Sequence, residues 1–324
     1  MNITSALLSR TILLLSIFGL SNAAPVEDTV ASAGDAVPAK HAPLTPGNHF
    51  RTLLVDGRGR SYLVHVPPNY DPERPTPVVL VFHGAAMNGS MMELFCGLNK
   101  KADSEGFITV YPNGTGKLIF FAFNPTATSN KDRPDDVAYV ARLLDDLESV
   151  TNVDPKRVFA TGLSNGGMMC YRLALDMADR IAAIAPVAGT LIGPEKAPSR
   201  PVPVLHFHGT SDTLVPFGEP DSSSFKFLRF RTVDETMRLW ARLDGCPDKP
   251  AIENLPDIAN DGTTVERETF GPGQAGSEVV LIKIAGGGHT WPGMQPWIKS
   301  IGRSTKDISA NDLIWDFFVK HPMP

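Results

Sequence analysis

Short apolar runs recur along the chain, separated by turn residues and by stretches with helical spacing. Each run is rich in β-branched residues and bounded by glycine, proline or polar turns. Such runs are typical of strands buried on both faces of a mainly parallel sheet. These predicted strands are 77–82, 107–111, 158–161, 181–188 and 202–207, followed by 265–270 and 278–284.

Helical patterns alternate with these strands. Apolar residues recur at helical spacing over 91–102, 135–150, 168–177, 233–243 and 310–318. Asp135 and Asp136 are predicted to cap the second of these helices. Ahead of them, 50–55 and 61–66 flank an Asp-Gly turn and predict an antiparallel hairpin. Strands alternating with helices indicate an α/β fold with a mainly parallel central sheet and helices on both faces.

One turn carries a nucleophile motif. Gly162-Leu163-Ser164-Asn165-Gly166 reads Gly-x-Ser-x-Gly and lies between a predicted strand and a predicted helix. In that context a sharp turn holds the serine in a strained conformation, and the glycines let neighbouring backbone pass close. An ordinary Gly-Ser turn in a loop is the alternative. We predict that Ser164 is the nucleophile of an acyl-transfer reaction.

Two backbone N–H groups are predicted to form an oxyanion hole. Asn165 starts the helix after Ser164, so its N–H can point at a developing negative charge. Ala85 follows His83 and Gly84 at the end of a buried strand, where α/β-hydrolases place the second donor. His83 is expected to brace this loop through hydrogen bonds. A simple strand-to-helix turn is the alternative.

Asp212 and His289 complete a triad in the chain order serine, acid, histidine. Asp212 lies on the loop after the strand 202–207, where its carboxylate can accept a hydrogen bond from imidazole Nδ1–H. His289 follows three glycines past the last predicted strand, so its loop can bring the imidazole over Ser164 as general base. A turn-forming aspartate is the alternative reading of Asp212.

Other side chains near these turns have less specific assignments. Trp291 either shapes the wall of the substrate pocket or covers the core. Phe121 either contacts substrate or anchors its loop, and His83 is a further candidate for the pocket wall. His206 and His208 are rival histidines, and we expect them to pack in their strand.

The amino-acid composition limits which classes of binding partner and cofactor are expected. The chain has 324 residues, of which 42% are hydrophobic, enough for one large domain with a sizeable core. A net charge of -5 and no long basic run make nucleic acid an unexpected partner. No histidine stands at ligand spacing beside Cys96, Cys170 or Cys246, so no metal and no cofactor are expected. These three cysteines allow at most one disulfide, whose pairing stays open.

The N-terminal segment has the pattern of a secretory signal. In residues 1–23, Arg10 precedes an apolar core and small residues stand at the cleavage position. The apolar core is too short to span a membrane comfortably, with an uncleaved anchor as the alternative. Residues 24–48 are Ala/Pro-rich and predict a flexible leader, and 49–324 are the predicted catalytic domain. A secreted protein, extracellular or periplasmic, without stable membrane insertion is expected.

Further motifs surround the predicted triad. They are Val81-Phe82-His83-Gly84, Tyr111-Pro112-Asn113-Gly114, Pro186-Val187-Ala188-Gly189, His208-Gly209-Thr210-Ser211-Asp212 and Gly287-Gly288-His289-Thr290-Trp291-Pro292-Gly293. With the serine turn, they resemble the secreted polyhydroxybutyrate-depolymerase-like esterases, a group similar to feruloyl and acetylxylan esterases. The resemblance covers about 51–321. It implies an α/β-hydrolase fold, a metal-independent carboxylic ester hydrolase, and the same triad and oxyanion pair.

The expected function is therefore that of a secreted serine esterase. Its expected partners are ester substrates: feruloyl or acetyl groups on plant polysaccharide, or polyester-type hydroxyalkanoate oligoesters. A serine peptidase of the same fold is one alternative, and the family likeness disfavours it. A non-catalytic surface-binding protein is another, and the intact triad disfavours it.

Overall fold

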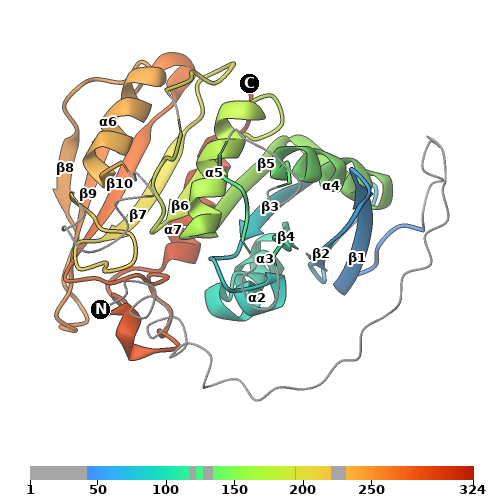
Figure 1. Ribbon diagram of the computed structural model, residues 1–324, viewed down its shortest axis with the longest axis horizontal. Helices are drawn as coiled ribbons and strands as arrows, with labels where there is room; N and C mark the ends of the chain where they lie inside the picture. The colour runs from blue at the N-terminus through green and yellow to red at the C-terminus, as the bar shows by residue number, and fades with distance from the viewer. Residues whose placement is uncertain (1–41, 117–121, 127–133, 194, 220–230) are drawn as a thin grey trace, which may run out of the picture. The chain divides into compact units, whose positions relative to one another are not determined.

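A computed structural model describes residues 42–116, 122–126, 134–193, 195–219 and 231–324 (Figure 1). These residues belong to one compact unit, Lys40–Pro324. The predicted signal peptide and most of the predicted leader lie outside the described residues. The first strand begins at Gly47, so the sheet includes the last residues predicted as leader. In the described part, no helix combines the length and the apolar character needed to cross a membrane.

The described residues form one ten-stranded sheet in the order β1-β2-β4-β3-β5-β6-β7-β10-β9-β8. The strands are β1 Gly47–Val55, β2 Arg58–Val66, β3 Thr76–Phe82, β4 Ile108–Pro112, β5 Val153–Leu163, β6 Ile184–Val187, β7 Val204–Gly209, β8 Ala251–Asn254, β9 Thr264–Phe270 and β10 Val279–Ala285. From β4 to β10 in this order, neighbouring strands are parallel. Antiparallel pairs extend both edges. The predicted mainly parallel central sheet is confirmed.

Helices cover both faces of this sheet, as predicted (Figure 1). One face carries α4 Asp136–Val150, α5 Asn165–Asp176 and α6 Val233–Leu243. The other face carries α2 Gly89–Cys96, α3 Asn99–Glu105 and α7 Ala310–Lys320. Short 3-10 turns occur at Gln274–Gly276 and Lys299–Ile301. Strand β3 serves both layers: Val78, Leu80 and Phe82 pack beneath the first set of helices, and Val79 and Val81 beneath the second. Every residue of β3 is buried, which explains its continuous apolar run.

The N-terminal hairpin forms where it was predicted. Val55 pairs with Arg58, so Asp56 and Gly57 make a two-residue turn between β1 and β2. Both turn residues have positive φ, 49° and 72°, as a tight hairpin turn of the primed type requires. The hairpin adds an antiparallel edge to the parallel block through the β2–β4 pairing.

Two elements differ from the prediction. The helix predicted over 91–102 is divided into α2 and α3, because Gly97 adopts a left-handed φ of 61° and its N–H closes α2 on Glu93. The segment after 246 was predicted as irregular, yet β8 pairs there with β9. All four residues of β8 are exposed on this edge strand, so no apolar alternation marks it.

The three cysteines are all free. Cys96 and Cys170 are buried in separate helices, α2 and α5, and Cys246 is partly buried after α6. The single disulfide that the sequence allowed therefore does not form.

Candidate active site

Ser164 stands on a strained turn between β5 and α5. Its backbone has φ 56° and ψ -118°, a conformation that residues other than glycine rarely adopt. A Cβ on Gly162 or Gly166 would come within 2.7 or 2.2 Å of the carbonyl oxygen of Phe82 in β3. Only glycine fits at these two positions, because β3 passes against the turn. The strand, turn and helix that a nucleophile elbow requires are all present.

The predicted oxyanion loop lies against this turn. A Cβ built on Gly84 would be 3.6 Å from Cβ of Ser164, so the residue that follows, Ala85, is close to the serine. On the other side, Asn165 is the first residue of α5 and presents its N–H at the positive end of the helix. The Asn165 side chain also has a role that the sequence did not suggest. Its Oδ1 accepts the Phe123 N–H at 2.7 Å and its Nδ2 donates to the Phe123 carbonyl at 3.1 Å.

His83 braces the predicted oxyanion loop through hydrogen bonds, as expected. Gly114 N–H donates to its Nε2 at 2.9 Å, so the ring proton lies on Nδ1, which donates to the Gly84 carbonyl at 2.7 Å. The side chain is fully buried and packs against Phe123, with ring centroids 4.6 Å apart. The suggestion that His83 lines the pocket wall is therefore wrong, because no part of the side chain is exposed. Burial lowers its pKa to about 4.

We expect His83 to make the fold sensitive to acid. Below its ordinary pKa of 6.5 the unfolded chain binds a proton, whereas the folded chain binds it only near pH 4. The stability present above pH 6.5 is thus lost as the pH falls through that window, by up to about 1.4 kcal/mol per pH unit from this residue. Urea unfolding between pH 6.5 and 4 measures the slope. His83→Gln cannot titrate and should show a shallower slope; identical slopes would contradict the prediction.

Asp212 and His289 meet directly. His289 Nδ1 donates to Asp212 Oδ2 at 2.7 Å, and both residues are buried. Asp212 Oδ1 accepts the backbone N–H groups of Leu214 and Val215 at 2.8 and 3.0 Å. Burial alone would raise the pKa of Asp212, but His289 and these hydrogen bonds bring it below the ordinary value. The bond to Nδ1 leaves Nε2 of His289 as the nitrogen available to a serine hydroxyl.

The glycines before His289 serve close backbone packing. A Cβ on Gly209, at the end of β7, would lie 2.3 Å from the Gly287 carbonyl oxygen. A Cβ on Gly288 would lie 2.2 Å from the Ile301 carbonyl oxygen, and His289 N–H donates to the same oxygen at 2.7 Å. The loop therefore packs against β7 and the segment around Ile301. This contact places His289 beside the loop that carries Asp212.

Two further candidates for the pocket wall have different outcomes. Trp291 is 1% exposed, belongs to the core beneath α7, and donates from Nε1 to Asn311 Oδ1 at 2.9 Å. Its role as a pocket wall is wrong, because the ring is enclosed by the core. Phe121 lies outside the described residues. Its neighbour Phe123 is buried edge-on against Phe82, with centroids 5.1 Å apart.

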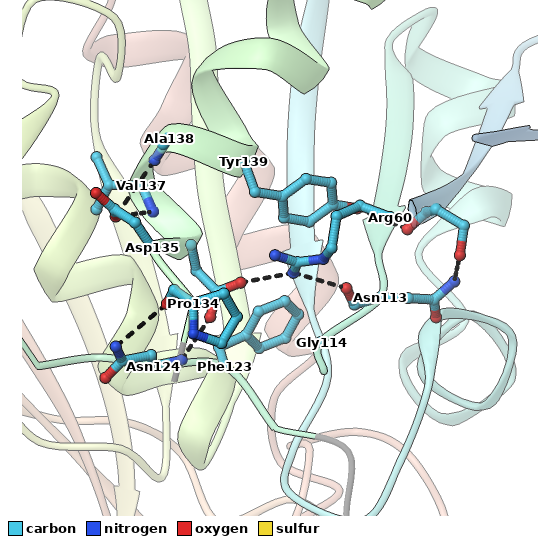
Figure 2. A network of polar contacts seen from close by, with 12 residues as sticks. Arg60, Asn113, Gly114, Phe123, Asn124, Pro134, Asp135, Val137, Ala138 and Tyr139 are labelled. Atoms are coloured by element: carbon cyan, nitrogen blue, oxygen red, sulfur yellow. Dashed lines mark hydrogen bonds and ion pairs between the residues drawn. The ribbon is translucent and has the colours of Figure 1, made fainter. Parts of the chain in front are cut away.

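A buried ion pair supports the segment next to the predicted oxyanion loop, and the sequence did not indicate it. Figure 2 shows the side chain of Arg60 beside the ring of Tyr139. The Arg60 guanidinium carbon lies 3.7 Å from the centroid of that ring. The same group donates to Asp136 Oδ1 at 2.5 Å and to the Asn113 carbonyl at 3.1 Å. Asp136 Oδ2 in turn accepts the Asn124 N–H at 2.6 Å. The network ties the segment between β4 and α4 to the body of the sheet.

The two acidic residues at the start of α4 therefore have different roles. Asp135 is the N-cap, and its side chain accepts the N–H groups of Val137 and Ala138 (Figure 2). Asp136 was also predicted as a cap. It is instead the buried partner of Arg60, because the first turn of α4 lies against β2 and the Asn124 segment.

Arg60→Met should destabilise the fold by about 3–5 kcal/mol, because it leaves the Asp136 carboxylate buried without its partner. Urea unfolding measures the change. The double variant Arg60→Met, Asp136→Asn removes the uncompensated charge and keeps an acceptor for Asn124. It should be more stable than the single variant. Equal stability of Arg60→Met and the unmodified protein would exclude this role.

The site is equipped for proton transfer and hydrogen bonding. The candidate residues comprise a serine on a strained turn, an imidazole held by a buried carboxylate, and a helix N-terminus. Among the described residues, no three or more His, Cys, Asp or Glu side chains are grouped so that they could hold a metal ion. This set of groups can activate a hydroxyl nucleophile and stabilise an oxyanion.

Comparisons with known proteins place the chain among esterases. Residues 71–238, more than half of the chain, match the family described as phospholipase/carboxylesterase. The chain is 32% identical over 320 residues to a putative esterase, NocK, of Nocardia uniformis subsp. tsuyamanensis, covering 91% of this chain and 90% of the relative. It is 31% identical over 263 residues to the bifunctional acetylxylan esterase/xylanase XynS20E of Neocallimastix patriciarum, covering 81% of this chain and 33% of the relative.

A feruloyl esterase and a solved structure extend the comparison. Feruloyl esterase B of Piromyces equi is 30% identical over 239 residues, covering 71% of this chain and 42% of that protein. The acetyl xylan esterase from Aspergillus awamori superposes with a TM-score of 0.59 at 16% identity, covering 84% of this chain and 99% of that chain. At that identity the likeness establishes the fold.

Proposed function

The chain belongs to the phospholipase/carboxylesterase family of α/β-hydrolases and is a carboxylic ester hydrolase, and from this premise we propose that it works through an acyl-enzyme on Ser164. The elbow conformation of Ser164 supports its assignment as nucleophile. The single observation that carries the proposal is the His289–Asp212 hydrogen bond of 2.7 Å, which gives the imidazole the tautomer of a general base.

The proposed reaction has two steps. His289 Nε2 takes the hydroxyl proton of Ser164, whose oxygen attacks the ester carbonyl carbon. The tetrahedral intermediate collapses, His289 returns the proton to the departing alcohol, and an acyl-serine remains. A water molecule then gives its proton to His289 and attacks the acyl-serine, which releases the carboxylic acid and restores the hydroxyl.

The N–H groups of Ala85 and Asn165 are the proposed oxyanion donors. Their supports are the approach of Gly84 to Ser164 and the position of Asn165 at the start of α5. In a serine hydrolase, removing one oxyanion donor supplied by a side chain costs about 3–4 kcal/mol of transition-state stabilisation. Every substitution except proline leaves a backbone N–H in place, so we choose His83, which holds this loop by a hydrogen bond, as the residue to vary.

Feruloyl or acetyl esters on plant polysaccharide are the proposed substrates. Relatives of 30–31% identity carry the names acetylxylan esterase and feruloyl esterase, and they support this class. The resemblance of the motifs to polyhydroxybutyrate-depolymerase-like esterases keeps hydroxyalkanoate oligoesters as a second class. Rates on methyl ferulate, acetylated xylan, hydroxybutyrate oligomers and a peptide panel discriminate them. Turnover confined to peptides would overturn the ester assignment.

Export is a further part of the proposal. Arg10 followed by the apolar residues 11–20 supports a signal peptide removed near residue 23. N-terminal sequencing of the protein recovered outside the cytoplasm should begin near Ala24. Recovery only with an intact Met1 in the cytoplasm would refute export.

Covalent labelling tests the nucleophile directly. A fluorophosphonate probe should form one adduct on Ser164, located by mass spectrometry of the digested protein. Since the probe reacts only with a serine whose hydroxyl is activated, it should not label Ser211, which is exposed on the neighbouring loop. A label elsewhere, with Ser164 unmodified, would remove the assignment.

A further inference from the structure

A second row of polar groups lies behind the catalytic acid, in the layer between the sheet and helices α5 and α6. Tyr171 Oη is 2.8 Å from His206 Nδ1, and His206 Nε2 is 3.0 Å from His208 Nδ1. His208 Nε2 is 2.9 Å from the Val215 carbonyl oxygen and 3.5 Å from Asp212 Oδ2. Tyr171, His206 and His208 are at most 1% exposed. The proposed mechanism uses none of them.

The direction of these hydrogen bonds follows from the carbonyl at one end. A carbonyl oxygen only accepts, so His208 must carry its proton on Nε2. Burial lowers the pKa of His208 and of His206, so both rings are neutral. His208 Nδ1 therefore accepts from His206 Nε2–H, and His206 Nδ1 accepts from the Tyr171 hydroxyl. With this one arrangement of protons, the Tyr171 hydroxyl hydrogen and all four ring nitrogens have a hydrogen-bond partner.

The row connects the two halves of the site. Tyr171 belongs to α5, the helix that begins directly after Ser164. His206 and His208 are on β7, with ring planes 5° apart and centroids 5.2 Å apart. The last imidazole reaches the loop of Asp212 through Val215. A rigid line of hydrogen bonds thus runs from the nucleophile helix to the acid loop, through the interior of the fold.

Such a row would cost folding free energy if it served only to fill the interior. Buried imidazoles and a phenol lose their hydration, and apolar residues of similar volume would pack the same layer without that cost. Trp240 and Val204 show that this layer accepts large and small apolar side chains. A fully satisfied polar network has one property that an apolar layer lacks, namely a unique geometry.

We propose that Tyr171, His206 and His208 are positioning residues for Asp212. This proposal rests on the catalytic role proposed for Asp212 and Ser164. Oδ1 of Asp212 is held by two backbone N–H groups, and Oδ2 lies between His289 Nδ1 at 2.7 Å and His208 Nε2 at 3.5 Å. His208 fixes the loop through its hydrogen bond to the Val215 carbonyl, and the same Nε2 lies 3.5 Å from Oδ2. The carboxylate is thereby held in the orientation that His289 requires.

The protonation pattern can be read in the unmodified protein. Nitrogen-15 NMR of a histidine-labelled sample at pH 7 should show His206 and His208 as neutral rings protonated on Nε2. Single substitutions of the two histidines assign the signals. An Nδ1–H tautomer or an imidazolium at His208 would overturn the inference, because in both forms Nδ1 carries a proton and cannot accept from His206 Nε2–H. This measurement requires no turnover.

Two substitutions at one position separate positioning from packing. Glutamine places an amide N–H near the location of His208 Nε2, whereas asparagine reaches only the location of Nδ1. We expect His208→Asn to lower kcat by about a hundredfold with an unchanged KM. His208→Gln should stay within about tenfold of the unmodified protein. Tyr171→Phe keeps the ring, removes only the hydroxyl, and should lower kcat with an unchanged KM as well.

The outcomes are distinct from those of the proposed function. Fluorophosphonate labelling reports an activated Ser164 whichever step limits turnover, so its absence from the unmodified protein refutes the serine mechanism. With Ser164 labelled, an unchanged kcat in His208→Asn overturns the positioning role. Equal losses in His208→Asn and His208→Gln also overturn it, because the N–H towards Asp212 would then not matter. If His208→Asn does not fold, Tyr171→Phe and the NMR measurement decide.

Discussion

Ser164→Ala should abolish ester hydrolysis, with kcat falling by roughly a millionfold, the scale observed when a serine hydrolase loses its nucleophile. The alanine variant keeps the oxyanion donors and the substrate surface, so KM should change little. The remaining rate, roughly 10³–10⁴-fold above water, would come from those donors and from binding. Steady-state and burst kinetics with p-nitrophenyl acetate measure both quantities.

The control is a serine in the same region without a role in the proposed chemistry. Ser211 lies on the exposed surface of the acid loop, so Ser211→Ala should retain the rate of the unmodified protein. The backbone of Ser164 has a positive φ, and the strain of that conformation is the same for alanine as for serine because both carry a Cβ. The substitution should therefore leave the fold intact. Similar rates for Ser164→Ala and Ser211→Ala would refute the nucleophile.

Asp212→Asn is the second large effect expected, a loss of about 10⁴-fold in kcat. The Asn side chain can turn its amide N–H₂ towards His289 Nδ1, which then becomes the acceptor. The ring proton moves to Nε2, and that nitrogen can no longer take the hydroxyl proton of Ser164. The geometry is kept and the tautomer is wrong. Steady-state kinetics measure the loss of kcat, and the nitrogen-15 signals of His289 report which ring nitrogen carries the proton.

Asp248→Asn is the matched control, because Asp248 is an exposed aspartate after α6. It removes the same charge outside the proposed triad and should leave kcat unchanged. An Asp212→Asn variant that keeps more than about a tenth of the activity would show that the carboxylate does not set the tautomer of His289.

Features that depend on neighbours in the chain could be predicted from the sequence. The continuous apolar run of β3 predicts a strand buried on both faces, and the structure confirms it. The Asp56-Gly57 turn is set by the positive φ that those two residues tolerate. The elbow belongs to the same class, because strand, glycine, serine and helix follow one another within a short stretch.

Features that depend on distant partners could not be predicted in this way. Arg60 and Asp136 form their buried pair from β2 and α4, 76 positions apart, and each alone looks like an ordinary surface charge. Trp291 stands in a motif beside His289, yet the packing of α7 makes it part of the core. Strand β8 is exposed on every residue, so only its pairing with β9 reveals it.

The sequence alone determined the α/β fold and the order of Ser164, Asp212 and His289, because periodicity and turn chemistry act over a few residues. Only the tertiary structure fixed the 2.7 Å contact between His289 and the Asp212 carboxylate and the hydrogen bond that joins His206 to His208 in the interior. The parallel strands β5, β7 and β10 bring their carboxyl ends to one edge of the sheet, and side chains far apart in the chain become partners only there.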